Sequence, residues 1–218
     1  MTATLDMHEG TALITMDDSK ANALSHDMLE ALETAFDEAE KDADAIVITG
    51  REGKFCAGFD LKVMQGASPE DRLKLVTRGG KLGMRMFACP KPLVAAANGH
   101  GLAMGALMLL CCDTRVGAKG DYKFGLNETA IGMTMPTFGL ELARHRLAET
   151  ALTSAVIQAR IYDPKGAAKV GFLDLTVDGD AVVGTSLEIA AMLGKLPADA
   201  YAANKKNVRA GAMIAMMG

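Results

Sequence analysis

The chain has 218 residues, of which half are hydrophobic and 5% aromatic, and its formal net charge is −4. This length suits one domain with a substantial core. An acidic chain with few aromatic residues argues against a nucleic-acid partner, and the apolar run Leu102–Cys112 is shorter than the ~18 residues that a membrane helix needs.

The N-terminal stretch and the cysteines indicate a cytoplasmic protein. Met1–Glu9 has no basic region followed by an apolar one, so no secretory leader is expected. Cys56, Cys89, Cys111 and Cys112 have no metal-ligand spacing, and the last two are adjacent. We therefore expect reduced, packed thiols and no metal site.

The first 50 residues predict two strands, a helix and a third strand. The strands are expected at Leu5–His8 and Thr11–Met16, around a turn at Gly10. Ser25 is a predicted helix N-cap, and an apolar stripe at helical spacing follows it, formed by Leu29, Leu32, Phe36 and Ala39. The continuous apolar run Ala45–Thr49 is typical of a strand that is covered on both faces.

The middle of the chain predicts helices on either side of a buried strand. Ser68 followed by Pro69 marks a helix start, and the pair Gly79-Gly80 is expected to break or bend that helix. Cys89–Pro92 ends the helical stretch and leads into a strand at Leu93–Ala97. The run Gly101–Cys112 is apolar all round and predicts a buried helix.

The remainder is mostly helical. Short strands are expected at Thr114–Gly117, Tyr122–Phe124 and Leu173–Val177. The expected helices are Phe138–His145, Glu149–Gln158, Pro164–Val170, Ala181–Leu193 and Asp199–Ala210. The alternation of strands and helices predicts an α/β fold.

The small net charge hides an asymmetry along the chain. Residues 1–50 hold 2 basic and 12 acidic side chains, giving −10, and residues 51–91 hold 9 basic and 4 acidic ones, giving +5. The basic segment suits a phosphate-bearing ligand. An ordinary solvated helix surface accounts for it equally well.

Three glycine-rich segments carry the chemical signal. Phe55–Lys62 and Asn98–Gly105 each follow a predicted buried strand, and Phe124–Gly132 holds the pattern Gly-Leu-Asn-Glu-Thr. Glycine-rich turns that follow a strand, as in the first two segments, can leave backbone N–H groups free to bind an anionic oxygen. Two such turns that meet on one oxygen, with a carboxylate beside it, suit chemistry at a thioester.

Together with Asn22–Ser25, these segments resemble the crotonase superfamily, the enoyl-CoA hydratases and isomerases, over most of the chain. The Gly125–Gly132 stretch is most similar to the Δ3,Δ2-enoyl-CoA isomerases. The resemblance implies an α/β spiral of ββα turns over residues 1–195. It also implies a C-terminal helical segment at 196–218, shorter than is usual in the family, and a homotrimer or dimer of trimers.

The resemblance also implies roles for individual residues. The backbone N–H groups of Phe59 and Met104 form an oxyanion hole, and Glu128 is the catalytic base, with a pKa raised by apolar surroundings. Hydratases of the family have a second glutamate where this chain has Leu107. Leucine cannot hold a water or move a proton, whereas isomerisation needs only one carboxylate, so the isomerase interpretation leads.

An acyl-CoA substrate, with no separate cofactor, is implied by the same resemblance. The adenine end is expected near Phe55–Ala57 and Lys62, the pantetheine arm near Ala23 and Leu24, and Lys20 within reach of a phosphate. Asp60, which matches a common family residue, is expected to cap a turn. The full set of expected substrate-binding residues is Lys20, Ala23, Leu24, Phe55, Ala57, Asp60, Leu61, Lys62 and Gly105.

Other functions remain open at this point. A hydratase that uses Glu128 alone is the main enzymatic alternative, a thioester hydrolase is another, and a non-catalytic acyl-CoA-binding protein is a third. A dinucleotide site is disfavoured because Gly99, Gly101 and Gly105 do not have Gly-x-Gly-x-x-Gly spacing.

Overall fold

The computed structural model describes residues 2–217 and contains two sheets. The larger one has six strands in the order β1-β2-β3-β5-β7-β9, in which only the β1–β2 pair is antiparallel. Its strands are β1 (Ala3–His8), β2 (Thr11–Met16), β3 (Ala45–Gly50), β5 (Leu93–Ala97), β7 (Thr114–Ala118) and β9 (Leu175–Val177). The smaller sheet is parallel and contains β4 (Gly53–Cys56), β6 (Gly99–Leu102) and β8 (Phe124–Gly125).

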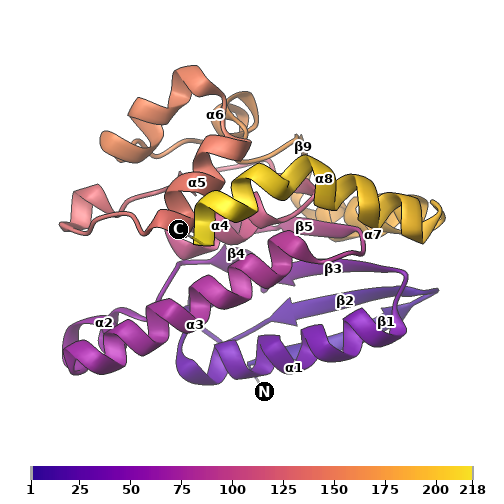
Figure 1. Cartoon of the computed structure of the whole chain (residues 1–218), viewed down its shortest axis with the longest axis horizontal. Helices are drawn as coiled ribbons and strands as arrows, with labels where there is room; N and C mark the ends of the chain where they lie inside the picture. Colours follow the sequence, from indigo (N-terminus) through magenta and orange to yellow (C-terminus); the bar gives the residue numbers. More distant parts are fainter. Residues whose placement is uncertain (1, 218) are drawn as a thin grey trace.

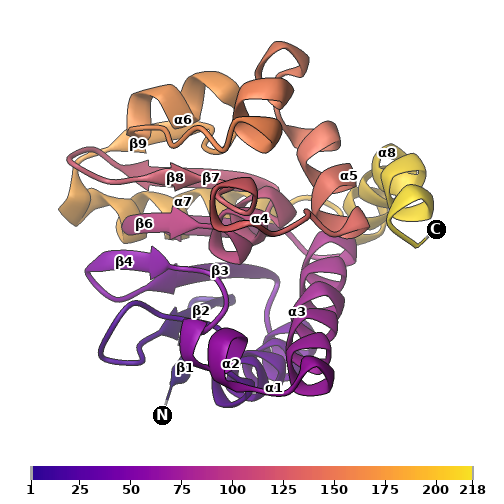
Figure 2. The same cartoon turned by 90° about the vertical axis from the view of Figure 1, so that its left-hand side faces the viewer.

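The chain advances as a spiral in which each turn gives one strand to each sheet. The strand pairs β3–β4, β5–β6 and β7–β8 follow one another, and Figure 2 shows β4, β6 and β8 stacked in that order. Helices close the turns: α2 (Leu61–Gly66) and α3 (Pro69–Ala88), then α4 (Met104–Cys111), then α5 (Thr137–Arg146). The predicted spiral of ββα turns is confirmed.

Helices cover both faces of the larger sheet (Figure 1). Helix α1 (His26–Asp42) begins where the Ser25 side chain accepts a hydrogen bond from the Met28 N–H at 3.2 Å, and it buries the predicted apolar stripe against β1, β2 and α3. Helix α7 (Val182–Gly194) packs on β3, β5 and β7. The main core lies on the α1 side and a smaller cluster under α7, so β3 and β5 are buried throughout.

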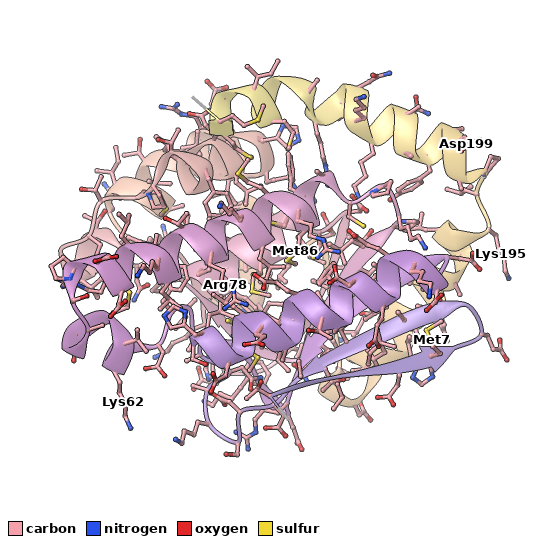
Figure 3. The ribbon with its side chains drawn as sticks, turned by 60° about the horizontal axis from the view of Figure 1, so that its bottom comes forward. Met7, Lys62, Arg78, Met86, Lys195 and Asp199 are labelled. Atoms are coloured by element: carbon pink, nitrogen blue, oxygen red, sulfur yellow. The ribbon has the colours of Figure 1, made fainter. Side chains whose placement is uncertain are left out.

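Ion pairs between α1 and α3 explain much of the charge asymmetry. Arg78 lies 2.6 Å from Glu33, and Arg85 lies 2.5 Å from Glu40 and 2.8 Å from Asp37. Figure 3 labels Arg78 on α3, the helix that runs beside α1. Part of the basic segment therefore neutralises the acidic first 50 residues, and each partly exposed pair contributes about 0–1 kcal/mol.

Two predicted helix boundaries were wrong because packing and pairing override local preference. Helix α3 runs without a break through Gly79-Gly80, where a Cβ added at Gly79 would lie 2.5 Å from the Phe59 ring, so the glycine makes room for that ring. The predicted helix Gly101–Cys112 begins only at Met104, because Gly99–Leu102 pairs with β4 and β8 as a strand.

The C-terminal part is helical but less regular than predicted. The segment expected as one helix at Glu149–Gln158 is a 3₁₀ turn, η2 (Glu149–Ala151), followed by a π-helical turn, η3 (Thr153–Ile157). Further elements are η1 (Thr129–Ile131), α6 (Pro164–Val170), η4 (Gly179–Ala181) and α8 (Ala198–Met217). Helix α8 packs against α5 and α3.

The described residues were predicted to form neither a membrane span nor a metal site. No single helix within residues 2–217 is long and apolar enough to cross a membrane. Only the helix pair Gly179–Gly194 and Ala198–Met217 has the length and composition of a membrane span, and the two helices are bent by 104° relative to each other. The same residues contain no group of three His, Cys, Asp or Glu side chains that could hold a metal ion.

Candidate active site

The first glycine-rich turn leaves one backbone donor free. After β4 the chain runs parallel to residues 21–24: the Ala57 N–H donates to Ala21 O at 3.1 Å, Leu24 N–H to Gly58 O at 2.8 Å, and Asp60 N–H to Leu24 O at 3.1 Å. Successive peptide groups in an extended chain point to opposite sides. The Phe59 N–H therefore points away from Leu24, and within residues 2–217 it has no acceptor.

The second turn leaves another donor at the start of α4. Ala103 has φ 50° and ψ −124°, a conformation that side-chain-bearing residues rarely adopt and that costs on the order of 1–3 kcal/mol. Its N–H donates to Gly125 O and its C=O accepts from Leu107. The next N–H, that of Met104, has no acceptor in the described chain and lies at the positive end of the helix dipole.

Direct contact between the two turns holds these donors close together. A Cβ added at Gly58, which has φ +91°, would lie 2.8 Å from Ala103 Cβ and 3.3 Å from Met104 N. A Cβ at Gly105 would lie 2.1 Å from Cys56 O. Only glycine allows this approach at either position.

The third segment places a carboxyl group in an apolar wall. Glu128 follows β8 at the start of η1, and it is 7% exposed. Burial raises the pKa of its carboxyl group, and a hydrogen bond from its own backbone N–H offsets only part of that rise. Its Oε2 atom has no hydrogen-bond partner among the described residues.

These residues meet around a cavity of about 460 Å³. One wall is the face of α3 that carries Val76, Gly80 and Met84, and the opposite wall is the segment from Asn127 to Phe138. Six predicted residues line the cavity: Ala57, Phe59, Leu61, Met104, Leu107 and Glu128. Glu128 is the one carboxylate of the described chain in this lining, and Lys81 at the rim is the one cation.

Leu107 occupies the first turn of α4 and closes the cavity with hydrocarbon. It is 2% exposed, and a Cβ added at Gly139 on α5 would lie 3.0 Å from its Cδ1 atom. The position at which the resemblance places a second carboxylate therefore holds a packed aliphatic side chain.

The other predicted substrate-binding residues lie outside this lining. The side chains of Leu24 and Phe55 are fully buried in the core, so the predicted contact with coenzyme A would have to use their backbone. Lys20 and Lys62 are exposed, and Figure 3 shows Lys62 projecting from α2 away from the body of the molecule. Ala23 is half-buried.

Asp60 and Gly105 have structural roles beside the first glycine-rich turn. The Asp60 side chain caps α2 by accepting the Lys62 N–H at 2.7 Å, so the predicted capping role is confirmed. Gly105 allows α4 to approach β4.

Asn127 is a polar cavity residue that sequence reasoning missed. It lines the cavity beside Glu128, and its Oδ1 atom is enclosed without a hydrogen-bond partner among residues 2–217. A buried amide without a partner costs free energy unless a ligand or water satisfies it. Its place in the Gly-Leu-Asn-Glu-Thr pattern was the available signal.

Comparison with known proteins identifies similar sequences. A sequence model described as enoyl-CoA hydratase/isomerase matches residues 6–216. Enoyl-CoA delta isomerase 1, mitochondrial, of Homo sapiens is 29% identical over 208 residues, covering 94% of this chain and 69% of the relative. Short-chain-enoyl-CoA hydratase of Clostridium acetobutylicum is 30% identical over 191 residues, covering 85% of this chain and 72% of the relative.

Solved structures show the same architecture. An enoyl-CoA hydratase/isomerase family protein from Pseudomonas syringae superposes with a TM-score of 0.96 at 40% identity, covering 99% of this chain and 94% of that one. The human mitochondrial delta3-delta2-enoyl-CoA isomerase gives 0.95 at 27% identity, covering 100% and 86%.

Proposed function

The chain belongs to the enoyl-CoA hydratase/isomerase family, and from this premise we propose that it moves the double bond of a 3-enoyl-CoA to the 2-position. The acyl group would lie in the cavity between α3 and the Asn127–Phe138 segment, and its thioester carbonyl would accept from the Phe59 and Met104 N–H groups.

The proposed reaction needs one base and one oxyanion hole. The Glu128 carboxylate takes a proton from C2, and the electron pair of that C–H bond becomes a dienolate that extends from the carbonyl oxygen to C4. The two N–H groups stabilise the charge on oxygen by about 2.7–4 kcal/mol each. Glu128 then returns the proton to C4, which leaves the double bond between C2 and C3.

The observation that carries this proposal is the single carboxylate of the cavity lining. Among the described lining residues no other carboxylate accompanies Glu128, and Leu107 offers no group that could hold or activate a water. A mostly apolar cavity with one shuttling base suits proton transfer between two carbons of the same molecule.

A panel of matched thioesters tests the proposal. Purified protein is mixed separately with 3-hexenoyl-CoA and 2-hexenoyl-CoA, and the products are separated by chromatography. Formation of 2-hexenoyl-CoA from the first substrate, without 3-hydroxyhexanoyl-CoA, is the expected result. Saturable binding with no interconversion would instead identify a binding protein.

Hydration is the second candidate, and Asn127 is the observation that favours it. Its unpartnered Oδ1 atom could hold a water in the same cavity as Glu128. Accumulation of 3-hydroxyhexanoyl-CoA from the 2-enoyl substrate, at a rate above that of isomerisation, would favour a hydratase.

A further inference from the structure

Asn22 is a fully buried amide whose side chain is saturated with hydrogen bonds. Its Nδ2 group donates to Met16 O at 3.0 Å, to Lys54 O at 2.9 Å and to Phe55 O at 3.2 Å. Its Oδ1 atom accepts from the Asp18 N–H at 3.1 Å. The backbone is left-handed, with φ 53°, which asparagine tolerates better than most residues.

These bonds join the two sheets at one point. Met16 ends β2 of the larger sheet, whereas Lys54 and Phe55 belong to β4 of the smaller sheet. The fit is tight, because a Cβ added at Gly50 on β3 would lie 2.8 Å from Asn22 Nδ2. Asn22 therefore sets where β4 ends relative to the strands beside it.

The segment that contains Asn22 also orients the first glycine-rich turn. Ala21 O and the N–H and C=O of Leu24 bond to Ala57, Gly58 and Asp60. These three bonds flank Phe59 on both sides and leave its N–H free. A movement of residues 21–24 would consequently turn the Phe59 N–H with it.

Asp18 holds the same loop from its other end. Its carboxylate accepts the N–H groups of Lys20 at 2.7 Å, Asn22 at 2.9 Å and Ala23 at 3.1 Å. The loop that precedes the turn is therefore fixed by two side chains, neither of which lines the cavity.

We propose that Asn22 is a positioning residue for the oxyanion hole: its amide fixes residues 21–24, and these residues aim the Phe59 N–H at the thioester oxygen. This inference rests on the proposed function, because it assigns Asn22 a task only if the Phe59 N–H binds a thioester. Asn22 itself touches no substrate.

Asn22→Gly is the primary test variant, because glycine accepts the left-handed backbone while the side-chain amide and its Cβ are removed. Asn22→Asp is the second: it keeps the shape but places an oxygen against the Met16, Lys54 and Phe55 carbonyls. Leu173→Ala, which removes a core side chain outside the cavity lining, is the control for lost stability.

The readout is the infrared carbonyl band of bound hexanoyl-CoA that carries carbon-13 at the thioester carbon. Hydrogen bonds to the carbonyl lower its stretching frequency, so the band reports on the donors directly. We expect binding to lower the carbonyl stretching frequency clearly in the unmodified protein and in Leu173→Ala. In both Asn22 variants the frequency should fall by at most about half as much. Turnover should fall about tenfold to a hundredfold in the Asn22 variants, with KM changed much less.

Each alternative outcome has one meaning. An unshifted band in the unmodified protein overturns the oxyanion hole and the proposed function with it. A normal shift there that persists in Asn22→Gly or Asn22→Asp overturns the role of Asn22 and leaves the proposed function standing. Equal losses of band shift in Leu173→Ala and in the Asn22 variants would reduce Asn22 to a general stabilising residue.

Discussion

At Glu128, an apolar wall surrounds a carboxyl group that would have to gain and lose a proton in every proposed catalytic cycle. Glu128→Gln keeps the shape and removes the base, so turnover of 3-hexenoyl-CoA should fall by about 10²–10⁴-fold. Calorimetric titration with hexanoyl-CoA should show affinity close to that of the unmodified protein. Undiminished turnover would remove Glu128 from the mechanism.

The raised pKa of Glu128 predicts opposite effects of pH on rate and on stability. Because burial disfavours the charged form, the carboxylate destabilises the fold at pH values above its raised pKa, and this cost disappears below its ordinary value of 4.5. Glu128→Gln should therefore unfold at a higher temperature than the unmodified protein at about pH 8, with a difference that vanishes in acid.

Turnover, in contrast to stability, should increase as the pH rises. The base must be ionised in the free enzyme, so kcat/KM should fall as the pH drops through the Glu128 pKa, with a midpoint above 4.5. A midpoint at or below the ordinary value, or a constant difference in unfolding temperature across the pH range, would contradict this account.

Single residues were predictable where a motif named them and unpredictable where only the tertiary fold brings them together. The Gly-Leu-Asn-Glu-Thr pattern is sufficient to single out Glu128, and Leu107 follows from alignment with the same resemblance. Val76, Gly80 and Met84 of α3 line the cavity through a packing arrangement that helical periodicity does not specify. The burial of Phe55 and Leu24 depends likewise on which strand lies over them.

The contact between the β4–α2 turn and the β6–α4 turn is the element on which both backbone donors depend. A Cβ at Gly58 would lie 2.8 Å from Ala103 Cβ, which is too close. The substituted residue would also have to keep a φ of +91°, which is strained for any residue with a side chain. Gly58→Ala should therefore separate the turns and lower turnover about a hundredfold, by analogy with loss of one oxyanion-hole donor. Steady-state kinetics with 3-hexenoyl-CoA would measure it.

Gly184→Ala provides the matched control for that change. Gly184 lies in α7, where an added Cβ meets nothing within 4 Å, so alanine should leave turnover unchanged and stabilise the helix by about 0.5–1 kcal/mol. Normal turnover in Gly58→Ala would show that the two turns do not need this close approach.

Element boundaries were predictable wherever local signals agreed with packing. Ser25 and Ser68 do cap α1 and α3, and α6 spans the predicted Pro164–Val170. The Gly79-Gly80 pair misleads because glycine weakens an isolated helix, whereas here Gly79 gives α3 the room to pack on Phe59. The strand at Gly99–Leu102 was missed because three polar or glycine residues give no strand pattern until β4 and β8 pair with it.

At the scale of the whole molecule, α8 presents apolar side chains that are largely exposed in the described part of the chain. Val208 is 73% exposed, Ile214 68% and Met217 67%. We expect these residues to be buried between copies in the predicted homotrimer or dimer of trimers. Sedimentation should give a mass of three or six chains, and Ile214→Lys should shift it towards smaller species. A monomer at micromolar concentration would contradict the prediction.

The architecture was predictable in part. Alternating strands and helices indicate an α/β fold, and the structure confirms it. No periodicity in the sequence distinguishes the strands of the larger sheet from those of the smaller one. The family resemblance implied the spiral of ββα turns, and the division into two sheets is seen only in the structure. The irregular turns η2 and η3 could not be predicted because Glu149–Gln158 has ordinary helical composition, and its backbone geometry is set by contacts such as the 3.0 Å bond from Thr129 Oγ1 to Val156 O.

The spiral also dictates the order in which a nascent chain acquires its parts. Phe59, Met104 and Glu128 belong to three successive turns, so emergence from the ribosome delivers the amide donors first and the acid last. A polypeptide released after the second turn would lack Glu128 and also Gly125, whose C=O accepts the Ala103 N–H beside Met104. The proposed base and the bonds that hold the proposed donors are thus complete only once synthesis has passed the final turn of the spiral.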